Sequence, residues 1–66
     1  MNWDRIEGNW RQVQGKFKQK WGKLTDDDLL TINGSRERLI GKLQERYGKA
    51  RDELERELNN FDLVEV

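Results

Sequence analysis

The sequence predicts an all-α fold of four helices, arranged as two helical hairpins that pack against each other. A nine-residue segment recurs, because Gly41–Lys49 repeats Gly15–Lys23 at a shift of 26 residues. The six glycines also fall into two triplets spaced by seven residues, at positions 8, 15 and 22 and at positions 34, 41 and 48. Self-similarity of this kind is typical of a duplicated supersecondary unit. No alternation of apolar and polar residues indicates a strand.

The first helix is expected over about residues 3–21. Its apolar residues follow one another at steps of three or four, which places them in one stripe; they are Trp3, Ile6, Trp10, Val13, Phe17, Trp21 and Leu24. Asn2 can cap its start, and Gly22 can end it in the left-handed conformation. The aromatic residues could instead form a base-stacking platform. Their place on the stripe favours a core, with Trp3 as the expected exception.

A second, shorter helix is expected after Thr25. The segment Asp26-Asp27-Asp28 follows this threonine and puts carboxylates in the first turn, where the helix dipole favours them. Its apolar face would consist of Leu29, Leu30 and Ile32. Asn33-Gly34 is a strong stop signal. Because calcium loops alternate ligands with spacers, three adjacent aspartates indicate a helix start in preference to a metal site.

Two further helices complete the second unit. Ser35 can cap the third helix, and Gly48 interrupts it where Gly22 interrupts the first. The apolar face of the third helix consists of Leu39, Ile40, Leu43 and Tyr47. The fourth continues to about Asn59 with Ala50, Leu54, Leu58 and Phe61 at helical spacing, and residues 62–66 are expected to fray. The chain is then one domain, 1–66, with repeat units at about 8–32 and 34–58.

Charge is balanced overall but alternates along the chain. Residues 1–23 hold six basic and two acidic groups (+4), 24–33 three acidic groups (−3), 34–49 five basic and two acidic (+3), and 50–66 two basic and six acidic (−4). We interpret this pattern as basic long helices lying against acidic short ones. Since an exposed ion pair contributes only about 0–1 kcal/mol, the pattern would set topology more than stability.

The alternative interpretation is a basic face that binds nucleic acid. Arg5, Lys16, Lys20 and Lys23 follow one flank of the first apolar stripe, whereas Arg11 and Lys18 lie on the other side. Phosphate binding needs cations that converge on one surface. The split therefore makes nucleic acid the less favoured interpretation.

The composition excludes several kinds of site. The chain has no Cys and no His, so it lacks a disulfide framework, a cysteine metal site and the commonest general base. With Ser35 as the only serine, no catalytic triad can be assembled, and we expect no enzyme, metal or cofactor. No apolar stretch approaches the roughly 20 residues of a membrane span. The first residues lack the features of a secretory signal, so we expect a cytoplasmic protein.

Gly15 and Gly41 are unusual because each lies mid-helix, roughly opposite the apolar stripe. Alanine would be more stable there by about 1 kcal/mol. The glycines either let a helix from a second copy or a client approach closely, or keep their helices weak. The candidate interaction surface consists of Arg5, Gly15, Lys16, Lys20, Lys23, Gly41 and Lys42. We expect a protein or other macromolecular client, and a monomer or weak self-association.

Four short motifs stand out along the chain: Gly8-Asn9-Trp10, Gly15-Lys16, Trp21-Gly22-Lys23-Leu24-Thr25-Asp26-Asp27-Asp28 and Gly41-Lys42-Leu43-Gln44-Glu45-Arg46-Tyr47-Gly48. Together they resemble the CsbD-like family of bacterial general stress proteins. The resemblance covers about residues 1–60. It implies two orthogonally packed hairpins in a SAM-like arrangement, a role in the stress response, and no catalytic or ligand residues.

The expected function is therefore non-enzymatic protection or interaction. The hydrophilic, glycine-containing and cysteine-free composition is similar to that of hydrophilins, which shield other molecules during water loss. The alternative is a nucleic-acid or protein-binding adaptor that uses the basic first and third helices. Salt-dependent nucleic-acid binding would favour the adaptor.

Overall fold

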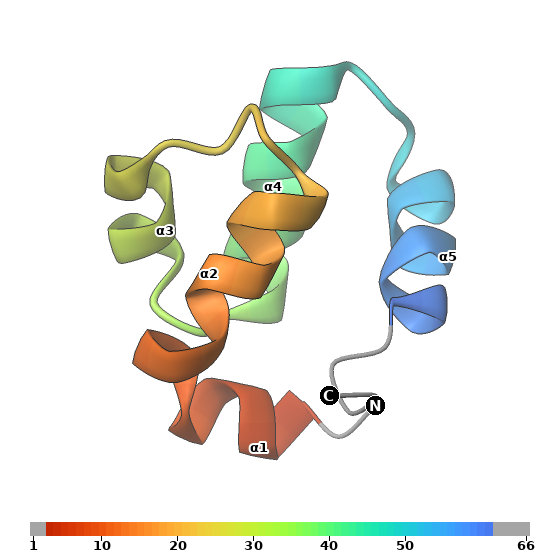
Figure 1. Ribbon diagram of the computed structural model, residues 1–66. Helices are drawn as coiled ribbons and strands as arrows, with labels where there is room; N and C mark the ends of the chain where they lie inside the picture. The colour runs from red at the N-terminus through yellow and green to blue at the C-terminus, as the bar shows by residue number, and fades with distance from the viewer. Residues whose placement is uncertain (1–2, 62–66) are drawn as a thin grey trace.

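The computed structural model describes residues 3–61, which form five α-helices and, within that range, no strand. The helices are α1 (Trp3–Gly8), α2 (Trp10–Lys20), α3 (Asp26–Ile32), α4 (Arg36–Tyr47) and α5 (Arg51–Asn60). Figure 1 shows α4 in the middle of the bundle, with α3 and α5 on either side of it. The all-α prediction is confirmed. The expected cap at Asn2 and the expected fraying of 62–66 lie outside the described residues.

The first expected helix, over residues 3–21, is broken into α1 and α2 at Asn9. This residue has φ −118° and ψ 30°, which is outside the helical range. Its N–H donates to the Arg5 carbonyl at 3.0 Å, and its own carbonyl accepts from the Val13 N–H at 3.1 Å. Its side-chain amide adds a second bond to the Arg5 carbonyl at 3.1 Å. The backbone groups at the bend are thus satisfied, so the chain changes direction there while its apolar stripe continues.

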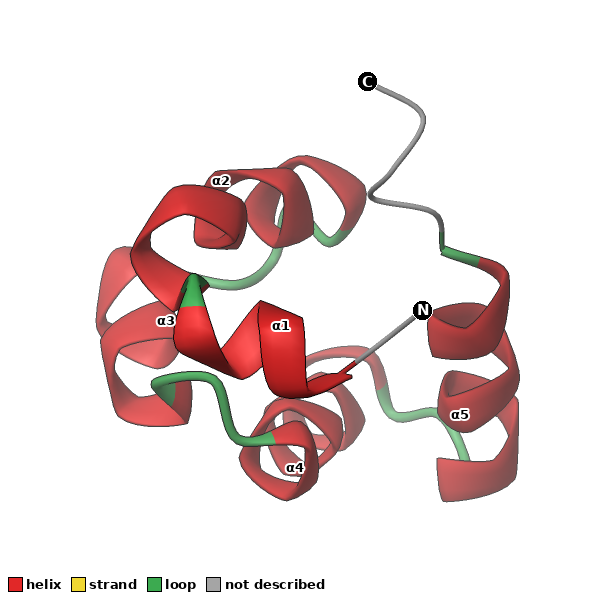
Figure 2. Cartoon of the chain, turned by 90° about the horizontal axis from the view of Figure 1, so that it is seen from below, coloured by secondary structure: helices red, strands yellow, loops and turns green. Residues whose placement is uncertain are grey.

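The bend lets α1 pack on the turn between α3 and α4. Trp3 donates its indole N–H to the Gly34 carbonyl at 2.8 Å. Gly34 has φ +85°, and a Cβ at this position would lie 3.1 Å from Cα of Glu7. Only glycine meets both demands, a left-handed backbone and a neighbouring helix in close contact. Figure 2 shows α1 on this side of the bundle, at an angle to α2.

The expected role of Gly22 at the end of the first helix is wrong. Among the described residues, the left-handed conformation occurs at Asn33, Gly34 and Gly48, so Gly48 ends α4 as expected and Gly22 differs from it. Helix α2 ends instead at Trp21, whose N–H donates to the Phe17 carbonyl at 2.8 Å. The Trp21 ring is buried in the core, and this burial fixes the end of α2 without a glycine turn.

The expected starts of α3 and α4 are confirmed. The Thr25 hydroxyl accepts from the Asp28 N–H at 3.0 Å, and Asp28 Oδ2 accepts from the Thr25 N–H at 3.0 Å. This reciprocal pair satisfies two backbone donors that the first turn of a helix leaves unpaired. Ser35 caps α4 in the same way, with its hydroxyl accepting from the Arg38 N–H at 3.3 Å.

The core contains residues from all five helices and surrounds Phe17, which is fully buried. Its buried apolar residues are Ile6, Trp10, Phe17, Trp21, Leu24, Leu29, Ile32, Leu39, Ile40, Leu43, Leu54 and Leu58. The Phe17 ring lies 5.2 Å from that of Trp10 and 5.9 Å from that of Trp21. The core interpretation of the tryptophans is confirmed, with Trp3 half-buried. Leu30 was expected in the apolar face of α3 but is 67% exposed.

The helices that pack most closely are α3 with α4 and α4 with α5. The first of these pairs crosses the boundary between the two repeat units, and the second lies within the second unit. Five helices therefore replace the expected four, because of the bend at Asn9. The arrangement as two orthogonal, SAM-like hairpins stays a prediction.

Replacing Phe17 with alanine tests the position of the core. Phe17→Ala should lower the free energy of unfolding by about 3–5 kcal/mol, because it opens a cavity at the centre of the core. Leu30→Ala is the control, and it should cost less than about 0.5 kcal/mol because this side chain is exposed. Urea unfolding followed by circular dichroism measures both. Equal losses in the two variants would contradict the described core.

Candidate interaction surface

The candidate surface residues lie on four segments of the chain. Arg5 is on α1; Gly15, Lys16 and Lys20 are on α2; Lys23 follows α2; and Gly41 and Lys42 are on α4. Their polar groups have very different surroundings. Lys42 of α4 contacts carboxylates of the same molecule, whereas Lys16 and Lys20 of α2 form no ion pair within residues 3–61.

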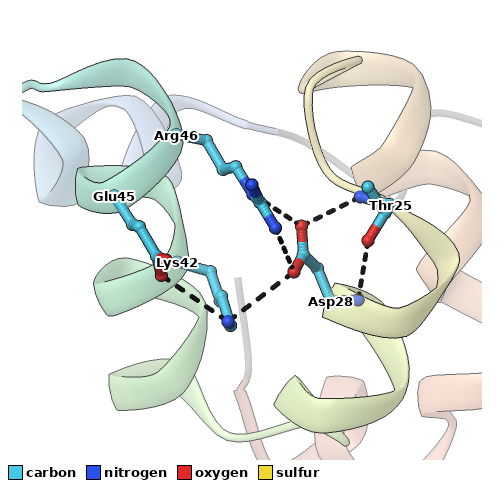
Figure 3. A network of polar contacts seen from close by, with 5 residues as sticks. All are labelled: Thr25, Asp28, Lys42, Glu45 and Arg46. Carbon is cyan, nitrogen blue, oxygen red and sulfur yellow. Dashed lines mark hydrogen bonds and ion pairs between the residues drawn. The ribbon is translucent and has the colours of Figure 1, made fainter.

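Lys42 belongs to a network of polar contacts around Asp28 (Figure 3). Asp28 is 3% exposed and is the one buried charged residue in the described part of the chain. Arg46 donates to both of its carboxylate oxygens, Nε to Oδ2 and an Nη to Oδ1, each at 2.9 Å. Lys42 Nζ lies 3.7 Å from Oδ1, and it also lies 3.5 Å from Oε1 of Glu45. The network therefore ties α3 to α4.

These contacts satisfy a carboxylate that would otherwise be costly to bury. The hydrogen bonds from Arg46, followed by the one from the Thr25 N–H, hold the pKa of Asp28 well below its ordinary value. The same pairing raises the pKa of Arg46. A fork of two parallel bonds is the strongest arrangement of an arginine and a carboxylate. Asp28 is thus both a helix cap and the ionic link between two helices.

Sequence reasoning assigned Asp28 to a helix start but missed its burial and its partner. Lys42 and Arg46 are four residues apart, so they project from the same side of α4. This spacing, together with an acidic segment nearby in the chain, was the available signal. This signal does not by itself predict the contact with Asp28, because the sides on which α3 and α4 face each other depend on the packing of the whole bundle.

The other ion pairs confirm that the alternating charges are used within the molecule. Lys49 lies 2.6 Å from Glu57, and this contact lowers the pKa of Glu57. Arg51 of α5 lies 2.7 Å from Glu37 of α4. In this last pair the cation belongs to the acidic helix α5 and the carboxylate belongs to the basic helix α4. Four ion pairs therefore join α4 to α3 or to α5, and Lys49, just after α4, adds two more to α5.

Helix α2 is different. Lys18 is paired with Asp26 at 2.7 Å, but Arg11 and Lys16 form no ion pair within residues 3–61. Lys20 Nζ lies 5.8 Å from the ring centre of Trp21, and Lys23 Nζ lies 5.0 Å from that of Tyr47. These two cations therefore pack on aromatic rings. Helix α2 presents several cations to solvent.

Gly15 and Gly41 lie on exposed faces of their helices. No atom lies within 4 Å of a Cβ built at either position. Neither glycine is therefore required by packing within the described chain. The two hypotheses for them, contact with another molecule and a deliberately weak helix, both stay predictions.

Residues 3–61 contain neither a metal-ligand cluster nor a membrane-spanning helix. No group of three or more acidic residues there has a geometry that could hold a metal ion. No helix in this range is both long enough and apolar enough to cross a membrane.

Comparison with known proteins gives consistent relatives. A family model described as CsbD-like matches residues 4–56. The chain is 52% identical over 62 residues to the UPF0337 protein YjbJ of Escherichia coli K12, covering 94% of this chain and 90% of that protein. It is 52% identical over 61 residues to the UPF0337 protein pc0632 of Protochlamydia amoebophila, covering 92% of each. No solved structure matches the chain.

Acid should destabilise the protein through Asp28. A carboxyl with a depressed folded-state pKa contributes stability that is present above its unfolded pKa of about 3.9, and this stability is lost as the pH falls toward the folded value. We expect the free energy of unfolding of the wild type to fall more steeply than that of Asp28→Asn as the pH is lowered below about 4. Asp27→Asn, at an exposed neighbour, should keep the wild-type slope. Urea unfolding at several pH values measures this, and equal slopes for the two variants would refute the role of Asp28.

Alanine at the two exposed glycines should stabilise the fold. Gly15→Ala and Gly41→Ala should each raise the free energy of unfolding by up to about 1 kcal/mol, because the added methyl meets no atom and glycine weakens a helix. Gly48→Ala should lower it, since Gly48 has φ +67°. Thermal melts distinguish these results. A loss of stability in Gly15→Ala would show that this position is packed.

Proposed function

The chain belongs to the CsbD-like family, and we propose that it is a non-enzymatic bacterial general stress-response protein. It would protect other macromolecules through weak and unspecific contacts, as hydrophilins do. The observation that supports this proposal is the nature of the exterior: charged, closed and without an apolar patch in the described part of the chain.

Almost all of the large apolar side chains of residues 3–61 lie in the core or pack against it. Among residues 3–61, Leu30 is the one large hydrophobic side chain that is exposed, while 39% of all residues are charged. A specific protein interface normally has an apolar centre, and large exposed apolar patches mark such sites. A surface of mixed charges favours solubility at high concentration. These properties suit a protectant that works at a high mole ratio to its client.

The interactions that hold the fold are also insensitive to common stresses. With no Cys and no His in the chain, the fold has no thiol to oxidise and no imidazole that titrates near neutral pH. Asp28, the one buried carboxylate among residues 3–61, has a depressed pKa, so it stays ionised in mild acid. A fold of this kind would persist under oxidative and moderately acidic conditions.

The second candidate function is an adaptor that binds nucleic acid or protein through its basic helices. The surroundings of α2 favour this hypothesis, whereas those of α4 do not. The cations Lys42 and Arg46 of α4 are directed at Asp28 and are poorly placed to meet a partner. Helix α2 has no equivalent internal carboxylate for Arg11 and Lys16. The adaptor hypothesis is therefore restricted to one helix.

A drying assay tests the protective function. A labile enzyme such as lactate dehydrogenase is dried and rehydrated with increasing amounts of the protein, and its remaining activity is measured. We expect recovery to rise gradually at mole ratios well above one, as weak contacts require. Phe17→Ala, which keeps the surface composition but not the core, shows whether the folded state is needed. Recovery no greater than that given by an equal mass of lysozyme would refute the proposal.

A further inference from the structure

Helix α2 is the only one of the five described helices that carries basic residues and no acidic residue. Its cations are Arg11, Lys16, Lys18 and Lys20. Each of the other four helices contains at least two Asp or Glu residues. All charged residues of α2 are therefore positive, although the chain as a whole is neutral and one of these cations, Lys18, is paired with Asp26 of α3 at 2.7 Å.

The internal repeat explains why the cations of α2 remain at the surface. The shift of 26 residues maps Lys16 and Lys20 of α2 onto Lys42 and Arg46 of α4. In α4 these two positions contact the buried Asp28. The same shift maps Asp28 onto Leu54, which is fully buried in the core. Leu54 therefore offers Lys16 and Lys20 no buried carboxylate like Asp28, although Lys20 lies near enough to Glu57 to help lower the pKa of that carboxyl.

The outer ridge also differs between the two helices. The repeat aligns Arg11 and Gln19 of α2 with Glu37 and Glu45 of α4. Both carboxylates of α4 are exposed and would repel an anionic partner. At the same positions α2 presents a guanidinium group and a neutral amide. The two copies of the unit have therefore diverged in charge on the face that solvent reaches.

On α2 the residues that face solvent, together with the half-buried Lys16, form three parallel rows. Successive residues of a helix are turned by about 100°, so Gln12, Gly15 and Gln19 lie together on the ridge opposite Phe17. Arg11 and Lys18 flank this ridge on one side, and Lys16 and Lys20 flank it on the other. At the centre of the ridge, nothing lies within 4 Å of a Cβ built on Gly15, so the backbone there is open to close approach.

We propose that α2 binds duplex DNA by lying in the major groove. This groove is about 12 Å wide and admits an α-helix. The neutral ridge would face the base edges, where glutamine can donate and accept hydrogen bonds. The two rows of cations would face the phosphates of the two strands. The split of the cations, which argues against a single phosphate patch, fits a groove with phosphates on both sides.

Other polyanions fit this face less well. A membrane-surface helix buries an apolar face in the lipid, whereas the outer face of α2 consists of polar and charged residues. Duplex RNA has a major groove too narrow for side chains to read. Duplex DNA therefore matches both the charge and the shape of the helix. DNA binding goes beyond the proposed protective function, and the result of the drying assay does not depend on it.

Fluorescence anisotropy with the full chain and a labelled duplex of about 20 base pairs tests the proposal, at about 50 mM and about 200 mM salt. The test variant Arg11→Gln/Lys16→Gln removes one cation from each side of the ridge. The control Arg38→Gln/Arg56→Gln makes the same change in net charge on α4 and α5, at exposed residues outside the candidate surface. We expect about a tenfold or greater loss of affinity in the test variant and less than about a threefold loss in the control. Circular dichroism confirms that each variant keeps its helices.

A second pair of variants separates groove binding from diffuse attraction. Gly15→Leu adds bulk at the centre of the ridge and removes no charge, whereas Gly41→Leu does the same at the equivalent position of α4. We expect Gly15→Leu to weaken DNA binding severely and Gly41→Leu to leave it unchanged. The proposal is overturned by no binding at the lower salt concentration, by equal losses in the two members of either pair, or by equally tight binding to duplex RNA or phosphatidylserine vesicles.

Discussion

The ion pair between Asp28 and Arg46 is the interaction on which the organisation of this bundle depends. A buried carboxylate is tolerated only when its oxygens are satisfied, and α4 supplies the necessary donors across the boundary between the two repeat units. The pair fixes which side of α4 faces α3. It also engages Lys42 and Arg46 of α4, whereas their counterparts Lys16 and Lys20 on α2 have no such partner. One difference between the units, Asp28 against Leu54, thus accounts for the different surroundings of these two pairs of cations.

The remaining stability has to come from a small core, since a chain of 66 residues without Cys has no covalent staple. Aromatic rings supply much of it, because each buries a large area. Their polar atoms also join helices: Trp10 donates to the Leu29 carbonyl at 2.9 Å, and Trp3 donates to that of Gly34 at 2.8 Å. The tryptophans therefore serve as both packing and hydrogen-bonding residues. Each of these two tryptophans therefore stabilises the small bundle both by burying its ring and by linking two segments of the chain.

Features that depend on neighbours in the chain could be predicted from the sequence, whereas features set by the bundle could not. The caps at Thr25 and Ser35, the left-handed end at Gly48 and most core residues follow from local patterns of three or four residues. The bend at Asn9 was hidden because the apolar stripe continues across it. The exposure of Leu30, the non-glycine end at Trp21 and the burial of Asp28 all depend on how α3 and α2 meet α4. For the interaction surface, the sequence gives the cations, but only the structure separates those that are paired from those that are not.

The central claim is that Asp28 and Arg46 are energetically coupled, so that the guanidinium group of Arg46 is committed to this contact. A double-mutant cycle with Asp28→Asn, Arg46→Gln and the double variant measures this coupling directly. Urea unfolding at neutral pH gives the four free energies. The account predicts a coupling energy of about 1–3 kcal/mol, as expected for residues that share one hydrogen-bonded network. Additive effects, with a coupling energy near zero, would contradict it.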